Sequence, residues 1–273
     1  MARQRSIPTN PGLYIYGGAA IFLGLLGLVS GDFAASWQNV GPDFPLRVPL
    51  AYLTAVVELA GGIALLVPRT ARTGALTLTI VYSVFTLIWV PRALVNLGNY
   101  DPIGNVFEDF ALVAAGLVLC ATFSPTGSSM AAKRPFFVLL FGICPISFGI
   151  VHIIDMPGLL NWIPGWLPPT RMFWAYATTM GFFAAAIAIL TGIMAPLAAR
   201  LLTAEIVVFE LLIWIPNLFR GPKNHFNWAA NAMCIALAGA AWVVSDTVSA
   251  AVRSKLIPAE SRREVNITAW TSI

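Results

Sequence analysis

The chain has 273 residues, of which 58% are hydrophobic and only 10% are charged, and its mean hydropathy is +0.80. Water-soluble folds carry many more charges than this, so lipid must be the solvent for most of the surface. The formal net charge of +4 does not indicate a nucleic-acid partner, because the basic residues lie mainly between apolar runs, where they set membrane orientation.

Apolar runs of about 20 residues, each long enough to cross a bilayer as a helix, recur along the chain. The predicted spans cover residues 13–31, 49–67, 74–95, 106–124, 135–155, 173–193, 197–219 and 227–246. Continuous apolarity favours helices over the strands of a β-barrel, in which apolar and polar residues alternate. The predicted fold class is therefore an all-α polytopic membrane protein with eight transmembrane helices.

Lys and Arg residues are unevenly divided between the two faces of the membrane when alternate loops are assigned to opposite sides. One face carries Arg3, Arg5, Arg69, Arg72, Lys133, Arg134, Arg200, Arg253, Lys255, Arg262 and Arg263, and the other carries Arg47, Arg92, Arg171, Arg220 and Lys223. This excess predicts that both termini are cytoplasmic, and we expect a bacterial inner membrane. A cleaved signal peptide is the alternative for the N-terminus, but no clean cleavage site follows the first apolar run.

The chain aligns with itself after a shift of about 124 residues. Gly41, Pro45, Arg47, Ala51, Tyr52 and Thr54 then fall on Gly165, Pro169, Arg171, Ala175, Tyr176 and Thr178. One inserted residue later, L-I-W-V-P at 87–91 aligns with L-I-W-I-P at 212–216. Because each copy has four crossings, both copies enter the membrane from the same side. The sequence thus predicts parallel repeats that form two four-helix bundles.

This repeat divides the chain into five predicted parts. They are a cytoplasmic N-terminus at 1–12, a first four-helix unit at 13–124, a cytoplasmic linker at 125–134, a second four-helix unit at 135–246 and a cytoplasmic tail at 247–273. The tail has little continuous hydrophobicity, so we expect it to be solvated or to lie on the membrane surface.

Several motifs mark the two units: V-E-L-A-G-G in the 56–62 region, P-R-T-A-R at 68–72, acidic residues at the start of the fourth span, and F-G-I-V-H at 148–152. This pattern resembles the DoxX-like family of small four-span membrane proteins, here duplicated in tandem. The resemblance implies an accessory or quinone-linked subunit in the oxidation of sulfur compounds. The second half departs from the pattern, because Phe182 stands where the first half has Glu58.

Three carboxylates, Glu58, Glu205 and Glu210, fall near mid-membrane with no Lys or Arg at the same depth. A charge there costs about 2.5–3.5 kcal/mol on insertion scales, so we expect these groups to be protonated or hydrogen-bonded to neighbouring helices. They either fix helix packing or carry protons or a ligand. Glu205 and Glu210 lie about 140° apart around a helix and should face different neighbours.

A second polar set lies at the outer ends of the spans. It comprises Asp32, Arg47, Arg92, Asp101, Glu108 and Asp109 in the first half and His152, Asp155, Arg171, Arg220 and His225 in the second. We expect Arg92 to meet Glu108 or Asp109, and Arg171 to meet Asp155, so that each half has a polar mouth. Interfacial charges at helix ends are the alternative interpretation.

Tryptophans fall at the same level as these charges and would provide flat walls for a lipophilic ligand such as a quinone head group. The candidate ligand-binding residues are Trp89, Arg92, Glu108, Asp109, Arg171 and Trp214. The alternative is the ordinary aromatic belt of a membrane protein. No metal is expected, because His152 and His225 lie in no metal-ligand spacing, and the cysteines form no C-x-x-C pair.

No self-sufficient catalytic or nucleotide-binding motif is present. The leading hypothesis is an accessory or small-molecule-binding subunit of a quinone-linked redox system, in contact with lipid and with a protein partner in a membrane complex. One alternative is a proton-coupled transporter or channel that uses Glu58, Glu205 and Glu210. The other is a structural or assembly subunit.

Overall fold

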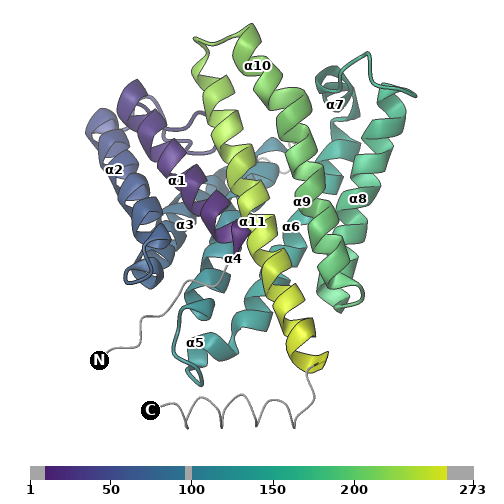
Figure 1. Cartoon of the computed structure of the whole chain (residues 1–273). Helices are drawn as coiled ribbons and strands as arrows, with labels where there is room; N and C mark the ends of the chain where they lie inside the picture. Colours follow the sequence, from purple (N-terminus) through teal and green to yellow (C-terminus); the bar gives the residue numbers. More distant parts are fainter. Residues whose placement is uncertain (1–9, 96–99, 257–273) are drawn as a thin grey trace, which may run out of the picture.

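A computed structural model describes residues 10–95 and 100–256 of the chain, and Lys255 and Leu256 in backbone only. All regular elements of these residues are helical (Figure 1). The helices of the first half are α1 (Pro11–Ser30), α2 (Arg47–Leu66), α3 (Ala71–Val95) and α4 (Asp101–Thr122), followed by the short α5 (Ser129–Ala132). Those of the second half are α6 (Arg134–Ile154), α7 (Met156–Trp162), α8 (Arg171–Thr191), α9 (Ala195–Phe209), the π-helix η1 (Glu210–Trp214), α10 (Ile215–Arg220) and α11 (His225–Leu256).

Seven of the described helices are long and apolar enough to cross a membrane: α1, α2, α3, α4, α6, α8 and α11. The chain is therefore an integral membrane protein, as predicted from its composition. Each of these helices begins and ends within a few residues of a predicted span, except α11 at its C-terminus. The remaining predicted span, 197–219, coincides with α9, η1 and α10, which follow one another without a loop.

Capping residues mark several of these boundaries. Asn10 caps α1 by accepting from the N–H of Leu13, Ser128 caps α5, and Thr170 caps α8 through the N–H of Phe173. Helix α1 ends at Gly31, whose positive φ of 64° suits glycine. Helix α11 instead continues to Leu256, ten residues beyond the predicted span, so the first part of the expected tail is helical. The rest of that tail, and most of the expected N-terminal segment, lies outside the described residues.

The helices of each half pack in chain order. In the first half α1 contacts α2, α2 contacts α3, and α3 contacts α4; in the second, α6 contacts α8, α8 contacts α9, and α9 contacts α11. The two halves join where α1 and α4 pack on α11 and where α4 packs on α6. One continuous cluster of buried apolar side chains runs through both halves. We refer below to α1–α4 as the first bundle and to α6–α11 as the second bundle.

Glycines allow α1 to approach its neighbours closely. A Cβ added at Gly12 would lie 2.3 Å from the backbone N of Val243 in α11, and one at Gly24 would lie 2.6 Å from the carbonyl oxygen of Ala55 in α2. Glycines of α1 thus serve close helix packing.

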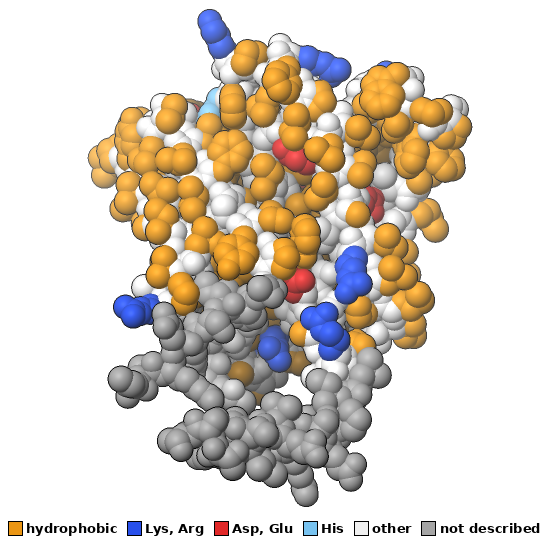
Figure 2. All heavy atoms as spheres, viewed as in Figure 1, with side chains coloured by type: hydrophobic (Ala, Val, Ile, Leu, Met, Phe, Trp, Pro, Cys, Tyr) orange, Lys and Arg blue, Asp and Glu red, His pale blue; other side chains and the backbone are white. Residues whose placement is uncertain are grey.

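The outer surface matches a lipid environment. Figure 2 shows hydrophobic side chains over the middle of the visible face, with Lys and Arg side chains gathered toward its two ends. Large apolar side chains stand exposed on the long helices, among them Leu53 on α2, Leu87 on α3 and Ile187 on α8. Such a surface would be costly in water and is suited to contact with acyl chains.

Candidate functional site

The segment between α1 and α2, residues 31–46, turns inward and closes one end of the first bundle. Phe33, Ala34, Trp37 and Gln38 of this segment are buried. The Gln38 amide donates to a carboxylate oxygen of Glu58 in α2 at 2.7 Å, and its oxygen accepts from the N–H of Ala34 at 2.9 Å. Glu58, of which only 1% is exposed, therefore anchors the inward-turning segment. It is hydrogen-bonded as predicted, although its partner is a loop residue and not a helix.

Other polar groups fill the same bundle. The Tyr16 hydroxyl donates to the carbonyl oxygen of Leu112 at 2.8 Å. Among the described residues, neither the Tyr82 hydroxyl nor Oδ2 of Asp109 has a hydrogen-bond partner, although both atoms are buried. Each of the four helices α1 to α4 thus places at least one polar side chain inside the first bundle.

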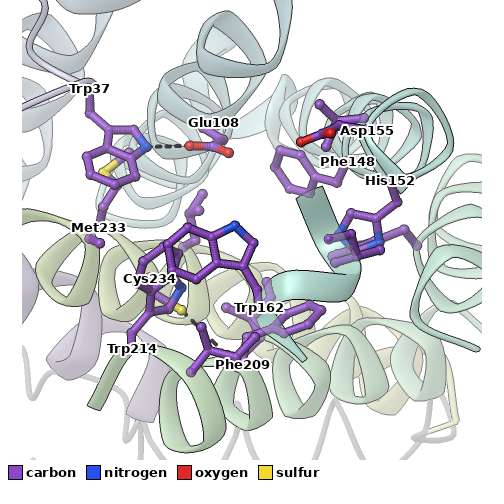
Figure 3. A pocket seen from close by; sticks show the side chains of 17 residues that line it. Trp37, Glu108, Phe148, His152, Asp155, Trp162, Phe209, Trp214, Met233 and Cys234 are labelled. Atoms are coloured by element: carbon purple, nitrogen blue, oxygen red, sulfur yellow. Dashed lines mark hydrogen bonds between the residues drawn. The ribbon is translucent and has the colours of Figure 1, made fainter. Parts of the chain in front are cut away.

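The second bundle contains a cavity of about 300 Å³ (Figure 3). Its walls come from α6, α7, α8, α9, η1 and α11, with Glu108 contributed by α4 of the first bundle and Trp37 by the inward-turning segment. The lining residues are Trp37, Glu108, Phe148, Val151, His152, Asp155, Leu159, Trp162, Phe182, Ile206, Phe209, Ile213, Trp214, Ala230, Met233, Cys234 and Leu237. A cavity of this size accepts a small ligand or the head group of a larger one.

Aromatic rings make up much of the wall. Phe182 stacks on Phe209 with centroids 6.2 Å apart, and Phe148 meets Phe182 edge to face at 5.5 Å. The rings of Trp162 and Trp214 lie 5.1 Å apart. Because these rings contact one another across α6, α7, α8, α9 and η1, the wall is held in place by packing of the whole bundle.

Polar groups occupy only part of the wall. Glu108 accepts a hydrogen bond from the Trp37 indole, and Asp155 caps α7 by accepting from the N–H of Gly158 at 3.1 Å. The His152 ring lies 3.4 Å from the Thr179 hydroxyl, and the Cys234 thiol donates to the carbonyl oxygen of Ile206 at 3.5 Å. Figure 3 shows the carboxylates of Glu108 and Asp155 in the upper part of the view, across from Trp162, Trp214 and Phe209. No Lys or Arg occurs among the described lining residues.

Two of the six predicted ligand-binding residues, Glu108 and Trp214, line the cavity. Trp89 and Arg92 lie together elsewhere: the Trp89 indole donates to the carbonyl oxygen of Trp37 at 3.3 Å, and the Arg92 guanidinium stands 5.3 Å from the Trp89 ring centroid. Asp109 is buried in the first bundle.

The predicted pairing of Arg92 with Glu108 or Asp109 is wrong for the described residues. Arg92 donates instead to the carbonyl oxygen of Asn39 at 2.8 Å, because the inward-turning segment brings that carbonyl to it. The Glu108 carboxylate accepts a hydrogen bond from the Trp37 indole. Arg47 forms an ion pair with Asp32 at 2.5 Å, within the part of the first half that the structure describes.

The predicted pairing of Arg171 with Asp155 is also absent from the described residues. The Asp155 carboxylate caps α7, and the Arg171 guanidinium lies beside Gly165, where a Cβ would be 2.7 Å from it. The two halves therefore do not form two equivalent polar mouths. The first bundle is closed by its inward-turning segment, and the second holds the cavity.

Glu205 and Glu210 face different neighbours, as predicted. Oε2 of Glu205 packs against Gly181 of α8, at 2.5 Å from where a Cβ would stand, whereas Glu210 lies close enough to Cys234 of α11 to interact with it electrostatically. The expected hydrogen bonds are not well formed: within the described part of the chain, Oε1 of Glu205 has no partner, and neither carboxylate oxygen of Glu210 meets hydrogen-bond geometry, so the Cys234 thiol is at most a weak partner.

Sequence reasoning missed Trp37, Phe182 and Phe209 as lining residues. Phe182 had a visible signal, because it replaces the acidic residue of the first half at the aligned position. Trp37 and Phe209 had none, since their place in the wall depends on how the inward-turning segment and α9 pack. Cys234 also lines the cavity, whereas Cys120 and Cys144 are buried away from it.

Comparison with known proteins gives no further guidance, since no family model, curated protein or solved structure matches the chain.

Proposed function

We propose that this protein binds a flat lipophilic molecule in the cavity of the second bundle. The observation that supports this is an aromatic cavity of about 300 Å³ with a few polar groups on one side, within an integral membrane protein. A mostly apolar pocket with a few convergent polar groups is the usual form of a small-molecule site. Its walls come from both bundles, so the ligand would contact the two halves at once.

The proposal includes an eighth crossing and a tandem repeat of a DoxX-like unit. Helices α3 and α9 begin at Ala71 and Ala195, 124 positions apart. Their buried positions keep this spacing from Ala75 and Ala199 to Tyr82 and Ile206. An extra residue within a helix is accommodated as a π-turn. The π-helix η1 lies where the alignment of the two halves takes one inserted residue.

With eight crossings both termini lie on one side, which the excess of Lys and Arg assigns to the cytoplasm of a bacterial inner membrane. The proposed role, by resemblance to the DoxX-like family, is that of an accessory subunit of a quinone-linked redox system. The ligand-binding part of the proposal depends on the cavity and not on this resemblance.

Tryptophan fluorescence of the purified protein tests the binding directly, because Trp37, Trp162 and Trp214 line the cavity. Titration with a short-chain ubiquinone, and separately with 4-methylbiphenyl, should change the emission saturably with at least one of them. Ala230→Phe would fill the cavity and should remove the saturable change. Ala250→Phe on the exposed face of the same helix is the matched control and should keep it. The proposal would be overturned if the emission of the wild-type protein changed only linearly with added ligand, or if the two variants gave the same saturable curve.

A further inference from the structure

The charges around the cavity are of one sign. Its described lining contains the carboxylates of Glu108 and Asp155 and the imidazole of His152, but no ammonium or guanidinium group. The basic residues expected there are engaged elsewhere, Arg92 with Asn39 and Trp89, and Arg171 beside Gly165. A carboxylate held inside an apolar wall without a basic partner, as Glu108 is, is costly, so a bound countercharge would stabilise it.

The wall opposite these carboxylates suits a cation as well. Aromatic faces carry negative electrostatic potential and attract organic cations, and the attraction strengthens when water is excluded. The rings of Phe182 and Phe209 stack on each other, and those of Trp162 and Trp214 lie in contact, so two ring pairs line the same cavity. Rings facing carboxylates form the arrangement that recognises quaternary ammonium groups.

A metal ion does not fit this lining. Among the described residues no three His, Cys, Asp or Glu side chains are grouped as ligands. A neutral quinone needs donors for its two carbonyl oxygens, and the two carboxylates do not supply them, since Glu108 and Asp155 both accept hydrogen bonds in this structure. Only the ring N–H groups of the described lining could serve such a ligand, and the carboxylates would be left without a role in binding it.

We propose that the cavity is selective for a flat lipophilic organic cation, held between the Phe182, Phe209, Trp162 and Trp214 rings and the carboxylates of Glu108 and Asp155. This inference rests on the proposed binding function and specifies the class of ligand. Glu108 is the main counter-ion, since it lies inside the wall, while Asp155 is an exposed residue at the end of α6.

A matched pair of probes separates charge from shape: N-methyl-4-phenylpyridinium is the cation, and 4-methylbiphenyl is its neutral isostere. Isothermal titration calorimetry of the purified protein, corrected with protein-free micelles, should give a dissociation constant roughly tenfold or more lower for the cation. Glu108→Gln keeps an acceptor for the Trp37 indole and should reduce this preference to about threefold or less. Glu205→Gln, which changes a half-buried carboxylate outside the lining, should leave the preference unchanged.

The outcomes distinguish this inference from the binding proposal. If the wild-type protein bound the two probes with equal affinity, or bound the neutral probe more tightly, the cation selectivity would be overturned and the binding function would still stand. Binding of neither probe would overturn the cation selectivity, and the binding function would fail with it if short-chain ubiquinone also gave no saturable change. The wild-type comparison decides the question even where Glu108→Gln fails to fold.

Discussion

Gln38 and Glu58 meet inside the first bundle, where the amide of the loop residue donates to the buried carboxylate at 2.7 Å. This contact fixes the inward-turning segment of residues 31–46 over the first bundle. In the proposed repeat Phe182 takes the place of Glu58, and it lines the cavity of the second bundle. The position that holds the segment's carboxylate anchor in the first bundle thus corresponds to a ring in the cavity wall of the second.

Replacing Glu58 with Leu should destabilise the protein, because the Gln38 amide would be left buried without a partner. The expected loss is about 1–3 kcal/mol in the free energy of unfolding. Glu58→Gln retains an acceptor and should lose less than half of that. Chemical denaturation in detergent, followed by circular dichroism, measures both variants. Equal stability of the Leu and Gln variants would show that the contact does not hold the segment in place.

Replacing Glu210 should have the opposite effect on the stability of the protein. Its two carboxylate oxygens are buried without a well-formed hydrogen bond among the described residues, with only the Cys234 thiol nearby, and 7% of the residue is exposed. Glu210→Leu therefore removes a poorly compensated polar group. We expect the free energy of unfolding to stay unchanged or to rise by about 1–3 kcal/mol. A proton flux assay in liposomes is the companion measurement. A flux present in the wild type and lost in Glu210→Leu would favour the transporter alternative over ligand binding.

The contact of α1 with α11 joins the two bundles and should tolerate no added side chain. Gly12→Ala would place a methyl group 2.3 Å from the Val243 backbone, and we expect a loss of about 1–3 kcal/mol of stability. Gly18→Ala, on the same helix with nothing within 4 Å, is the control and should be neutral or slightly stabilising. Thermal melting of the two variants in one detergent makes the comparison. A Gly12→Ala protein as stable as Gly18→Ala would contradict the close packing.

Removal of Arg92 should leave ligand binding intact, because its guanidinium contacts Asn39 and Trp89 outside the cavity. Trp214→Ala removes a lining ring and should weaken binding of N-methyl-4-phenylpyridinium about tenfold or more. Calorimetric titration of both variants measures the difference. If Arg92→Ala weakened binding as much as Trp214→Ala, the ligand would lie at the outer polar set predicted from the sequence and not in the cavity.

The eighth crossing can be tested by labelling single cysteines in intact cells. With Cys120, Cys144 and Cys234 replaced, Ile193→Cys before α9 and Lys223→Cys after α10 should react with a membrane-impermeant maleimide from opposite sides. Both positions are exposed, so the reagent can reach them. Labelling of both from the same side would mean that α9, η1 and α10 do not span the bilayer.

The membrane-spanning helices were predictable because a span depends only on the local run of apolar residues, which can be read directly from the sequence. Asn10 and Thr170 cap α1 and α8 in the structure, within a few residues of the span ends that the apolar runs predicted. The end of α11 was predicted ten residues too early because residues 247–256 continue the helix but do not form an apolar run.

The site was predicted only in part because it depends on contacts between distant segments. Glu108 and Trp214 were identified from their residue types and depth, which the sequence does show. The partner of Arg92 could not be predicted, since a backbone carbonyl of Asn39 carries no signal in the sequence. The cavity itself arises from ring packing between four helices and a π-turn, and no periodicity reveals such a space.

The central claim is that a ligand occupies the second bundle and not the first. An experimental structure with 4-(4-bromophenyl)-N-methylpyridinium, read from the anomalous signal of bromine, tests it most directly. The predicted result is a bromine peak within the cavity bounded by Phe182, Trp214 and Glu108. A peak confined to the lipid-facing surface or to the first bundle, with the cavity empty at saturating ligand, would contradict it.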